Sequence, residues 1–438
     1  MTSTSACTLR FSGRLSGMPP DIQRLLLDRS TAREPALQRT VASIIARVED
    51  QGDTALRELA LQFDGVTLDT IEVPADRMAR AADSIPKDLL RAMWRSAANI
   101  EIVHRAQLPT ATLTEIEPGV TVGRRPDPLQ RIGVYAPGGR AAYPSSVLMG
   151  AIPARVAGVP EIILCTPPGS DGLPAPSILA AAHISKVDRV FAVGGAGAVA
   201  AMCMGTHSIP RVDKVVGPGN AYVAEAKLQL ASLAAFDSPA GPSELLVIAD
   251  ESATATIIAR EVVAQAEHDP RAIAIVIAVG NATGAGIESA IADEAVRAKR
   301  HEIILESLGS RGGVVVVESL DEAIAIANDF APEHLMIATR RPEQVFAAIK
   351  NAGTVFLGQT SSVAFGDYLT GANHVLPTGG LARSYSGLST LDFIRWTTYQ
   401  TIDPQGAISL ADDVGKFADA EGLHAHAATA RQWASAPK

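Results

Sequence analysis

Short apolar runs that alternate with glycine turns and helical stretches constrain this chain more than any other feature. Between residues 131 and 239 each such run leads through a turn into a helical pattern. The runs are residues 132–135, 162–164, 190–193 and 214–216. Uninterrupted apolar runs are typical of strands buried on both faces, and their alternation with helices indicates a parallel sheet of right-handed βαβ units. This region is predicted to be a Rossmann-like domain.

A second series of the same kind runs from 240 to 380. Its predicted strands are residues 245–249, 273–279, 314–317, 335–338 and 354–357. The fold class is therefore α/β, with two Rossmann-like parallel-sheet domains facing one another across a crevice, where binding sites form.

The remaining segments are expected to be smaller extensions. Residues 1–34 lack periodicity and are expected to be a loose arm, whereas 35–110 show helical spacing and are expected to pack with the 240–380 domain. Residues 111–130 alternate around a Pro-Gly pair, which predicts a hairpin linker, and 381–438 predict a helical tail.

Composition narrows the class of partner. The net charge of -9 and the lack of a basic run argue against nucleic acid or a membrane surface, which favours a small-molecule substrate. The three cysteines are widely separated and form no C-x-x-C pair, and neither a signal peptide nor a bilayer-length apolar run is present. We expect a soluble, cytoplasmic protein.

Glycine turns follow three of the predicted strands, at residues 137–139, 194–195 and 217–220. Ligands of parallel sheets bind at the carboxyl ends of strands, where glycine lets a phosphate approach the backbone. None of the turns is a G-x-G-x-x-G motif, so the turns alone fit a dinucleotide site and simple tight turns equally well.

Polar side chains that could form a site occur in three places. Gln265 and His268 are three residues apart near the end of a predicted helix, so their side chains could meet on one ion. Glu333 and His334 are adjacent at the mouth of a predicted strand and can act together only if the backbone bends there. The loop 366–380 is rich in Asp, Asn, His and Gly. For the first two places, the alternative is a solvated Gln or Glu beside a histidine at a helix end.

Several longer motifs, in order along the chain, resemble those of the histidinol dehydrogenase family. The resemblance extends from about residue 131 to the C-terminus, and more weakly through the N-terminal helices. Its motifs are residues 193–202, 205–206, 212–214 and 217–223, Gly241-Pro242-Ser243-Glu244, Gln265-Ala266-Glu267-His268, Pro332-Glu333-His334-Leu335, Gly366-Asp367-Tyr368 and 373–378.

The resemblance implies a zinc enzyme that oxidises L-histidinol to L-histidine through a bound aldehyde, with reduction of two NAD. It implies one Zn²⁺ per subunit, with ligands at Gln265, His268, Asp367 and His426. His334 would take the alcohol proton, and Glu333 would activate the water that hydrates the aldehyde.

The resemblance also implies the binding residues. Substrate contacts fall on Ser243 and Glu421, beside the metal ligands and His334, with His374 as a further candidate. Dinucleotide contacts fall on Tyr135, Asn220 and position 197. The family usually has Gln at that last position, but this chain has Gly197. In the family the C-terminal ligand crosses between subunits of an intertwined homodimer, so His426 would complete the other chain's site.

Three alternatives stay open. Gly197 leaves room for a paralogue that oxidises another polar alcohol, such as a sulfonated diol. A zinc hydrolase could use Glu333 to activate a metal-bound water, but it would not need NAD. A binding protein without activity would have no need for both Glu333 and His334. The choice between NAD and NADP and the metal loaded in the cell are also open.

Overall fold

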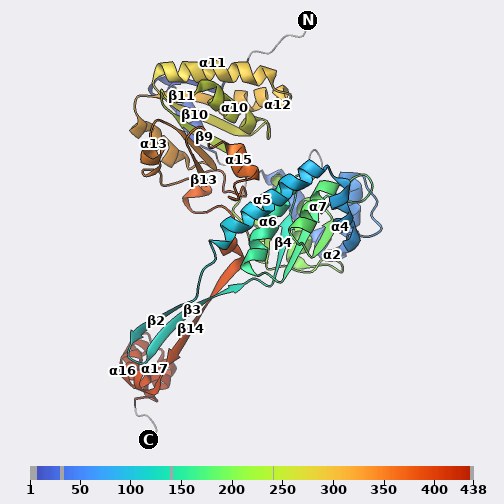
Figure 1. Ribbon diagram of the computed structural model, residues 1–438. Coiled ribbons are helices and arrows are strands. Elements are labelled where there is room, and N and C mark those ends of the chain that lie inside the picture. The colour runs from blue at the N-terminus through green and yellow to red at the C-terminus, as the bar shows by residue number, and fades with distance from the viewer. Residues whose placement is uncertain (1–6, 30–33, 139–141, 240, 435–438) are drawn as a thin grey trace.

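The computed structural model describes residues 7–29, 34–138, 142–239 and 241–434. It consists of two α/β bodies and a long extension that projects away from both (Figure 1). Part of the predicted arm (1–6 and 30–33), Gly139 of the first glycine turn and the last four residues lie outside the described residues.

The first α/β body is built on a parallel sheet of order β6-β5-β4-β7-β8. All four strands predicted in this region are confirmed. The strands are β4 (Arg131–Tyr135), β5 (Glu161–Thr166), β6 (Arg189–Ala192), β7 (Lys214–Val216) and β8 (Ala235–Phe236). The helices that connect them are α6 (Pro144–Ala157), α7 (Pro176–Ile184), α8 (Gly195–Met204) and α9 (Ala221–Gln229).

The N-terminal helices pack on this first body. They are α2 (Pro35–Gln51), α3 (Asp53–Leu59), its π-helical continuation η2 (Ala60–Asp64), α4 (Ala75–Ser84) and α5 (Lys87–Arg105). Helix α2 packs against α8 and α9, whereas α4 and α5 pack against α7 and α6. The expectation that 35–110 pack with the 240–380 domain was therefore wrong, because the apolar stripes of these helices complete the two cores of the first sheet.

The second body contains a six-stranded parallel sheet of order β1-β11-β10-β9-β12-β13. All five predicted strands are confirmed. The strands are β1 (Phe11–Arg14), β9 (Glu244–Ala249), β10 (Ile273–Val279), β11 (Gly312–Val317), β12 (His334–Ala338) and β13 (Thr354–Leu357). Strand β1 corrects the prediction of a loose arm, since it pairs with β11 and buries Phe11.

Helices cover both faces of this second sheet. One core contains α10 (Ala255–Ala266), α11 (Asn281–Arg297) and α12 (His301–Arg311). The other contains η1 (Leu15–Gly17), α1 (Pro20–Leu27), α13 (Leu320–Phe330) and α14 (Pro342–Phe346). Helix α15 (Val363–Tyr368) follows β13.

A loop of the second body is tied to the first. The Ser96 hydroxyl and the Asn99 amide, both on α5, donate to the carbonyls of Tyr368 and Leu369 at 2.5 and 2.6 Å. Asn373, farther along the same loop, donates to the carbonyl of Met149 on α6 at 2.8 Å. These bonds fix the loop that follows α15 against the first body.

The extension is a three-stranded antiparallel sheet of order β14-β3-β2 with two helices at its far end (Figure 1). Strands β2 (Thr112–Glu117) and β3 (Val120–Pro128) form the predicted hairpin. Strand β14 (Ile394–Ile402) was expected to be helical and instead pairs with β3. Two 3-10 turns, η3 (Leu381–Arg383) and η4 (Thr390–Phe393), precede it, and α16 (Pro404–Ala420) and α17 (His424–Arg431) follow.

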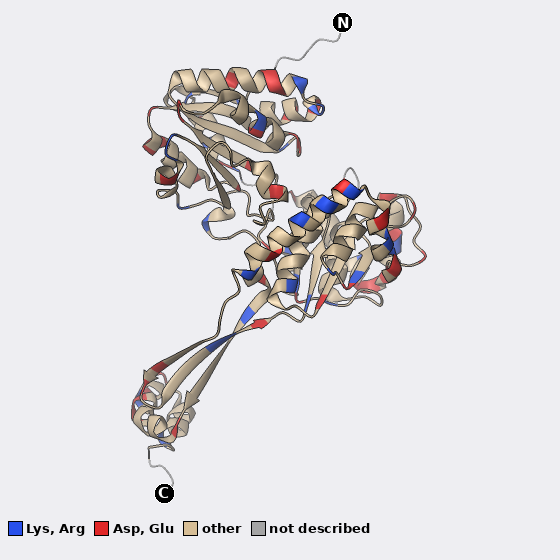
Figure 2. Cartoon of the chain, in the orientation of Figure 1, with Lys and Arg blue, Asp and Glu red and all other residues tan. Residues whose placement is uncertain are grey.

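Basic and acidic residues are interspersed along the ribbon of both bodies in Figure 2. No helix within the described ranges is long and apolar enough to cross a membrane.

Candidate active site

Glu333 and His334 lie side by side at the start of β12, in the interior of the second body. The backbone bends just before them, where Ala331 adopts a left-handed conformation at the end of α13. The carboxylate of Glu333 accepts a hydrogen bond from the backbone N–H of Glu244 at 2.7 Å. Nδ1 of His334 lies 3.6 Å from the same carboxylate. The bend therefore brings an acid and an imidazole to one centre.

The carbonyl of Glu244 fixes the tautomer of His334. It lies 3.0 Å from Nδ1, and because a carbonyl can only accept, Nδ1 carries the proton. In the neutral ring Nε2 then presents a lone pair. This Nε2 is buried without a hydrogen-bond partner, since Asp367 is 3.6 Å away, beyond normal hydrogen-bond length. In its neutral form, which a cation on Asp367 would favour by offsetting the charge of that carboxylate, His334 is arranged as a general base.

The surroundings shift both pKa values. Burial raises the pKa of Glu333 to about 7, and the nearby His334 offsets part of this shift. Burial alone would lower the pKa of His334, but the carboxylates of Glu333 and Asp367 outweigh it and raise that pKa to about 9.

The predicted ligand Asp367 lies at the end of α15 and is surrounded by imidazoles. Burial would raise the pKa of Asp367, but His334, His374 and His268 together lower it. Nδ1 of His374 also lies 2.9 Å from the backbone carbonyl of Asp367. The carboxylate is therefore held in its charged form, as a metal ligand requires.

Gln265 and His268 lie at the end of α10. The helix ends at Ala266, so His268 lies in the following turn and not on the helix as the spacing predicted. One turn before Gln265, the Glu261 carboxylate accepts from the N-terminal Val363 of α15 at 3.1 Å, which places this face of α10 against the helix that carries Asp367. Partial desolvation lowers the pKa of His268 and Asp367 opposes the shift, although the residue as a whole is exposed.

These residues fit a metal only as a partial ligand set. No group of three or more His, Cys, Asp or Glu within the described ranges is arranged to hold a metal ion. His268 and Asp367 supply one nitrogen and one oxygen, and the amide of Gln265 is buried with its nitrogen unpartnered. An amide ligates a metal through its oxygen, which a flip of the Gln265 amide would present in place of the unpartnered nitrogen; with His268 and Asp367 it then fits a divalent cation that receives further ligands from elsewhere.

Glu421 and His426 are not brought to this centre within one chain. Glu421 ends α16 and His426 lies in α17, both exposed, at the far end of the extension (Figure 1). Ser243, by contrast, directly precedes β9 and the Glu244 backbone groups that contact Glu333 and His334.

The predicted dinucleotide residues lie at the carboxyl edge of the first sheet. The Tyr135 hydroxyl accepts a hydrogen bond from the N–H of Gly195 at 3.1 Å, and burial raises its pKa to about 12. The Asn220 side chain caps α9 by accepting from the N–H groups of Tyr222 and Val223. A cavity of about 230 Å³ lies beside this turn, lined in part by Gly217 and Gly219.

Gly197 lies in α8 and faces the N-terminal helices. A Cβ at this position would lie 2.8 Å from Cδ1 of Leu59 and 3.5 Å from Cδ2 of Leu56. A side chain there would meet the leucines of α3, so at this position the chain offers only backbone groups to a ligand.

Two buried ion pairs near the site were missed from the sequence. Arg29 pairs with Glu244, and Lys227 pairs with Asp237 beside the 217–220 turn. A signal was available for Glu244, because it is a charged residue at the start of an apolar run; Lys227 lies among alternating polar residues and offered none. Arg29 had none, since it follows a short helix in a segment that lacked periodicity.

Comparisons with known proteins agree with this geometry. The family model of histidinol dehydrogenase matches residues 27–432. Histidinol dehydrogenase of Methanosarcina barkeri is 44% identical over 415 residues, which cover 94% of this chain and 95% of that protein. That of Methanothermobacter thermautotrophicus is 46% identical, over 90% and 92%. The crystal structure of histidinol dehydrogenase from Elizabethkingia anophelis matches with a TM-score of 0.92 and 34% identity, over 98% of both chains. The chain belongs to the histidinol dehydrogenase family.

Proposed function

We propose that the protein oxidises L-histidinol to L-histidine in two successive hydride transfers to NAD, through bound histidinaldehyde, as the last step of histidine synthesis. Membership of the family supports the reaction. The observation that carries it in this chain is the buried Nε2 of His334, which has no hydrogen-bond partner and whose tautomer is set by the Glu244 carbonyl.

His334 acts first. Its Nε2 accepts the hydroxyl proton of the alcohol while hydride leaves the same carbon for the nicotinamide, which yields the aldehyde and one NADH. Because Nδ1 already donates to the Glu244 carbonyl, the proton arriving at Nε2 gives an imidazolium stabilised by Glu333 and Asp367.

Glu333 acts second. A carboxylate with a pKa of about 7 is poised to take a proton from water at neutral pH, so that hydroxide adds to the aldehyde carbon. The hydrate then loses a second hydride to NAD and becomes the carboxylate. Burial of Glu333 thus keeps the pKa of this base close to neutral pH.

Gln265, His268 and Asp367, completed by His426, would hold a zinc ion. When bound, the metal would supply positive charge that holds the imidazole and amine nitrogens of the substrate. Ser243 and Glu421 would bind substrate beside it, with His374 as a further contact. Tyr135, Asn220 and the backbone at Gly197 would contact the dinucleotide.

Completion of the site requires a second copy of the chain. The far end of the extension exposes large apolar side chains on and beside α16 and α17, among them Phe417 (75% exposed), Trp433 (48%), Val414 and Leu423 (both 44%). An apolar cluster of this kind is typical of a surface that another protein covers. We infer an intertwined homodimer in which His426 and Glu421 of each copy reach the other copy's site. The three free cysteines support a cytoplasmic location, which is part of the proposal.

A steady-state assay tests the reaction. The zinc-loaded protein with L-histidinol and NAD should form two NADH for each histidine. No turnover of histidinol alongside NAD-dependent oxidation of a sulfonated diol would favour the paralogue. Zinc-dependent cleavage of an ester or amide substrate without NAD would favour a hydrolase, and a protein that binds zinc but converts no substrate would be a binding protein.

Mixing two inactive variants tests the shared site. His334→Asn and His426→Ala are each expected to be inactive. If the sites are shared, one site in each mixed dimer carries both intact residues, so random re-association should restore about one quarter of wild-type activity. No recovery, with mixed dimers demonstrated by mass spectrometry, would place His426 outside the other copy's site.

A further inference from the structure

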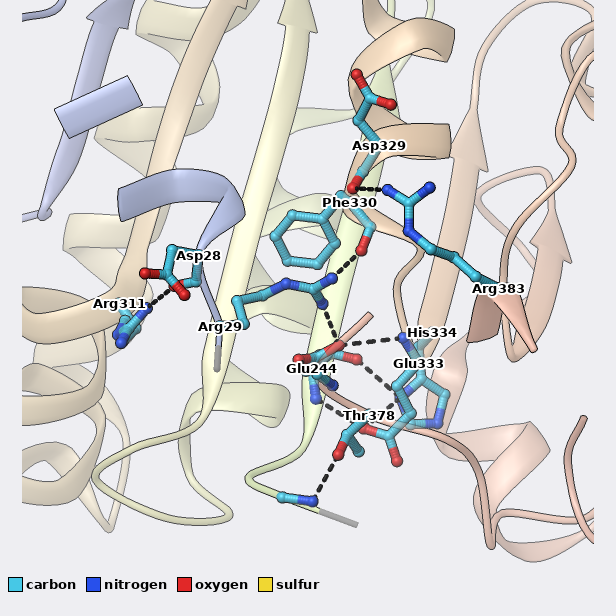
Figure 3. A network of polar contacts seen from close by, with 12 residues as sticks. Asp28, Arg29, Glu244, Arg311, Asp329, Phe330, Glu333, His334, Thr378 and Arg383 are labelled. Atoms are coloured by element: carbon cyan, nitrogen blue, oxygen red, sulfur yellow. Dashed lines mark hydrogen bonds and ion pairs between the residues drawn. The ribbon is translucent and has the colours of Figure 1, made fainter. Parts of the chain in front are cut away.

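We propose that Arg29 and Glu244 form a buried ion pair that positions both Glu333 and His334 for the reaction. This inference rests on the proposed function for the roles of Glu333 and His334. Figure 3 shows the network, in which the N-terminal segment reaches the start of β9 beside the two catalytic side chains.

Both partners of the pair are removed from water. The side chains of Arg29 and Glu244 are 3% and 2% exposed. The guanidinium of Arg29 also donates to the carbonyl of Phe330 and lies over the ring of the same residue, 3.6 Å from its centroid. These contacts fix the position of the guanidinium, which is always positively charged.

Glu244 contacts Glu333 and His334 through its backbone and its side chain. Its N–H donates to the Glu333 carboxylate, and its carbonyl accepts from Nδ1 of His334. Its own carboxylate accepts from the N–H of Glu333 at 3.4 Å and from the N–H of Gly379 at 2.9 Å. A shift of Glu244 would therefore move the base and the acid together.

The charge of Arg29 explains why the arrangement holds. The buried carboxylates of Glu244 and Glu333 lie close together, and burial raises the pKa of Glu244 while Arg29 opposes that shift. An unpaired buried carboxylate is strongly unfavourable. The nearby Arg311 and Arg383 bind the backbone carbonyls of Asp28 and Asp329, so compensation of Glu244 falls to Arg29.

Arg29→Met is the direct test, because it keeps most of the aliphatic stem and removes the charge. We expect kcat to fall about 10- to 100-fold, the scale of a small misplacement of catalytic groups, with little change in KM for histidinol or in zinc content. Arg29→Lys should recover most of the loss. Arg311→Met is the matched control, because it removes a guanidinium that binds the carbonyl of Asp28, the residue before Arg29. It should leave kcat unchanged.

A charge-neutral pair tests the mechanism. Glu244→Gln keeps the shape of the side chain and one acceptor oxygen but removes the negative charge, so Arg29→Met combined with Glu244→Gln leaves no unpaired charge. If compensation of charge is the role of Arg29, the double variant should be more active than Arg29→Met alone. Additive losses, or equal losses in Arg29→Met and Arg311→Met, would overturn the inference.

A second readout does not depend on turnover. Nitrogen NMR of ¹⁵N-histidine-labelled protein, with the His334 signals assigned by their loss in His334→Asn, reports which ring nitrogen carries the proton. At pH 10, above the pKa of about 9, wild type should show the Nδ1-protonated form, and Arg29→Met a mixture of tautomers. An unchanged tautomer in a folded Arg29→Met would overturn the positioning role, whereas a wild-type protein inactive on histidinol would overturn only the proposed function.

Discussion

Gly197 gives a quantitative test of the proposed dinucleotide site in the first body. A Cβ at this position would lie 2.8 Å from Leu59 Cδ1, closer than real Cβ contacts allow, and Leu59 is itself buried at 7% exposure. Leu59 must therefore rotate or α3 must shift to accommodate any side chain. A glutamine at 197, the usual family residue, would be directed into the same leucines.

The magnitude for Gly197→Ala follows from two opposing effects. Overpacking a buried site costs about 1–3 kcal/mol, and replacing glycine by alanine within a helix gains about 1 kcal/mol. The net loss is about 0–2 kcal/mol, which lowers Tm by up to about 8 °C at roughly 2–4 °C per kcal/mol for a body of this size. Gly197→Gln should lower Tm further, because it adds a longer polar side chain to the same space.

Thermal denaturation and the KM for NAD are the assays. Gly197→Gln alone should not lower the KM for NAD, whereas Gly197→Gln with Leu59→Ala should regain stability and bind NAD more tightly. Gly286→Ala is the matched control, since its Cβ would meet nothing within 4 Å, and it should keep or raise Tm. A Gly197→Gln protein as stable as wild type, with a lower KM for NAD, would refute the packing argument.

Three further predictions concern the site. His334→Asn should slow alcohol oxidation by about 10²- to 10⁴-fold, as for loss of a positioned general base, while zinc analysis shows the metal retained; an unchanged rate would remove His334 from that role. In metal-free protein the folded pKa of His334 is raised from 6.5 to about 9, so its stabilising contribution is complete below pH 6.5 and is lost as pH rises towards 9. Urea unfolding should show this loss in metal-free wild type but not in His334→Asn, and added zinc should lower the pKa by neutralising Asp367. Lys227→Met removes the donor to the Gly217 carbonyl and leaves the Asp237 carboxylate unpaired, so Tm should fall and the KM for NAD should rise more than that for histidinol; equal changes in the exposed control Lys416→Met would contradict this.

The periodic parts of the fold could be predicted from the sequence, because they bury continuous apolar runs. Strands β4 to β7 and β9 to β13 lie where those runs are. Strand β1 could not be predicted, since its four residues include Ser12, Gly13 and Arg14 and become a strand only by pairing with β11. The packing side of α2 and α4 was equally hidden, because an apolar stripe shows that a helix is covered but not by which sheet.

Some residues of the site could likewise be predicted from the sequence, and others could not. The motifs located Glu333, His334 and Asp367, which one chain brings together. The spacing of Gln265 and His268 predicted a helix that extends to His268, but α10 ends at Ala266 and His268 lies in the turn that follows. Arg29 escaped prediction because its importance arises from a tertiary contact with Glu244, more than two hundred positions away.

The hydrogen bonds of Ser96 and Asn99 on the first body with the loop after α15, and of Asn373 in that loop with the first body, couple the two halves of the molecule mechanically. Asp367 immediately precedes the tethered carbonyls of Tyr368 and Leu369, so a hinge rotation between the bodies would drag this carboxylate with it. A dinucleotide bound to the first body and an alcohol bound beside Asp367 would therefore both act on this tethered loop. By thermodynamic reciprocity, a closure favoured by one ligand strengthens the affinity for the other to the same degree.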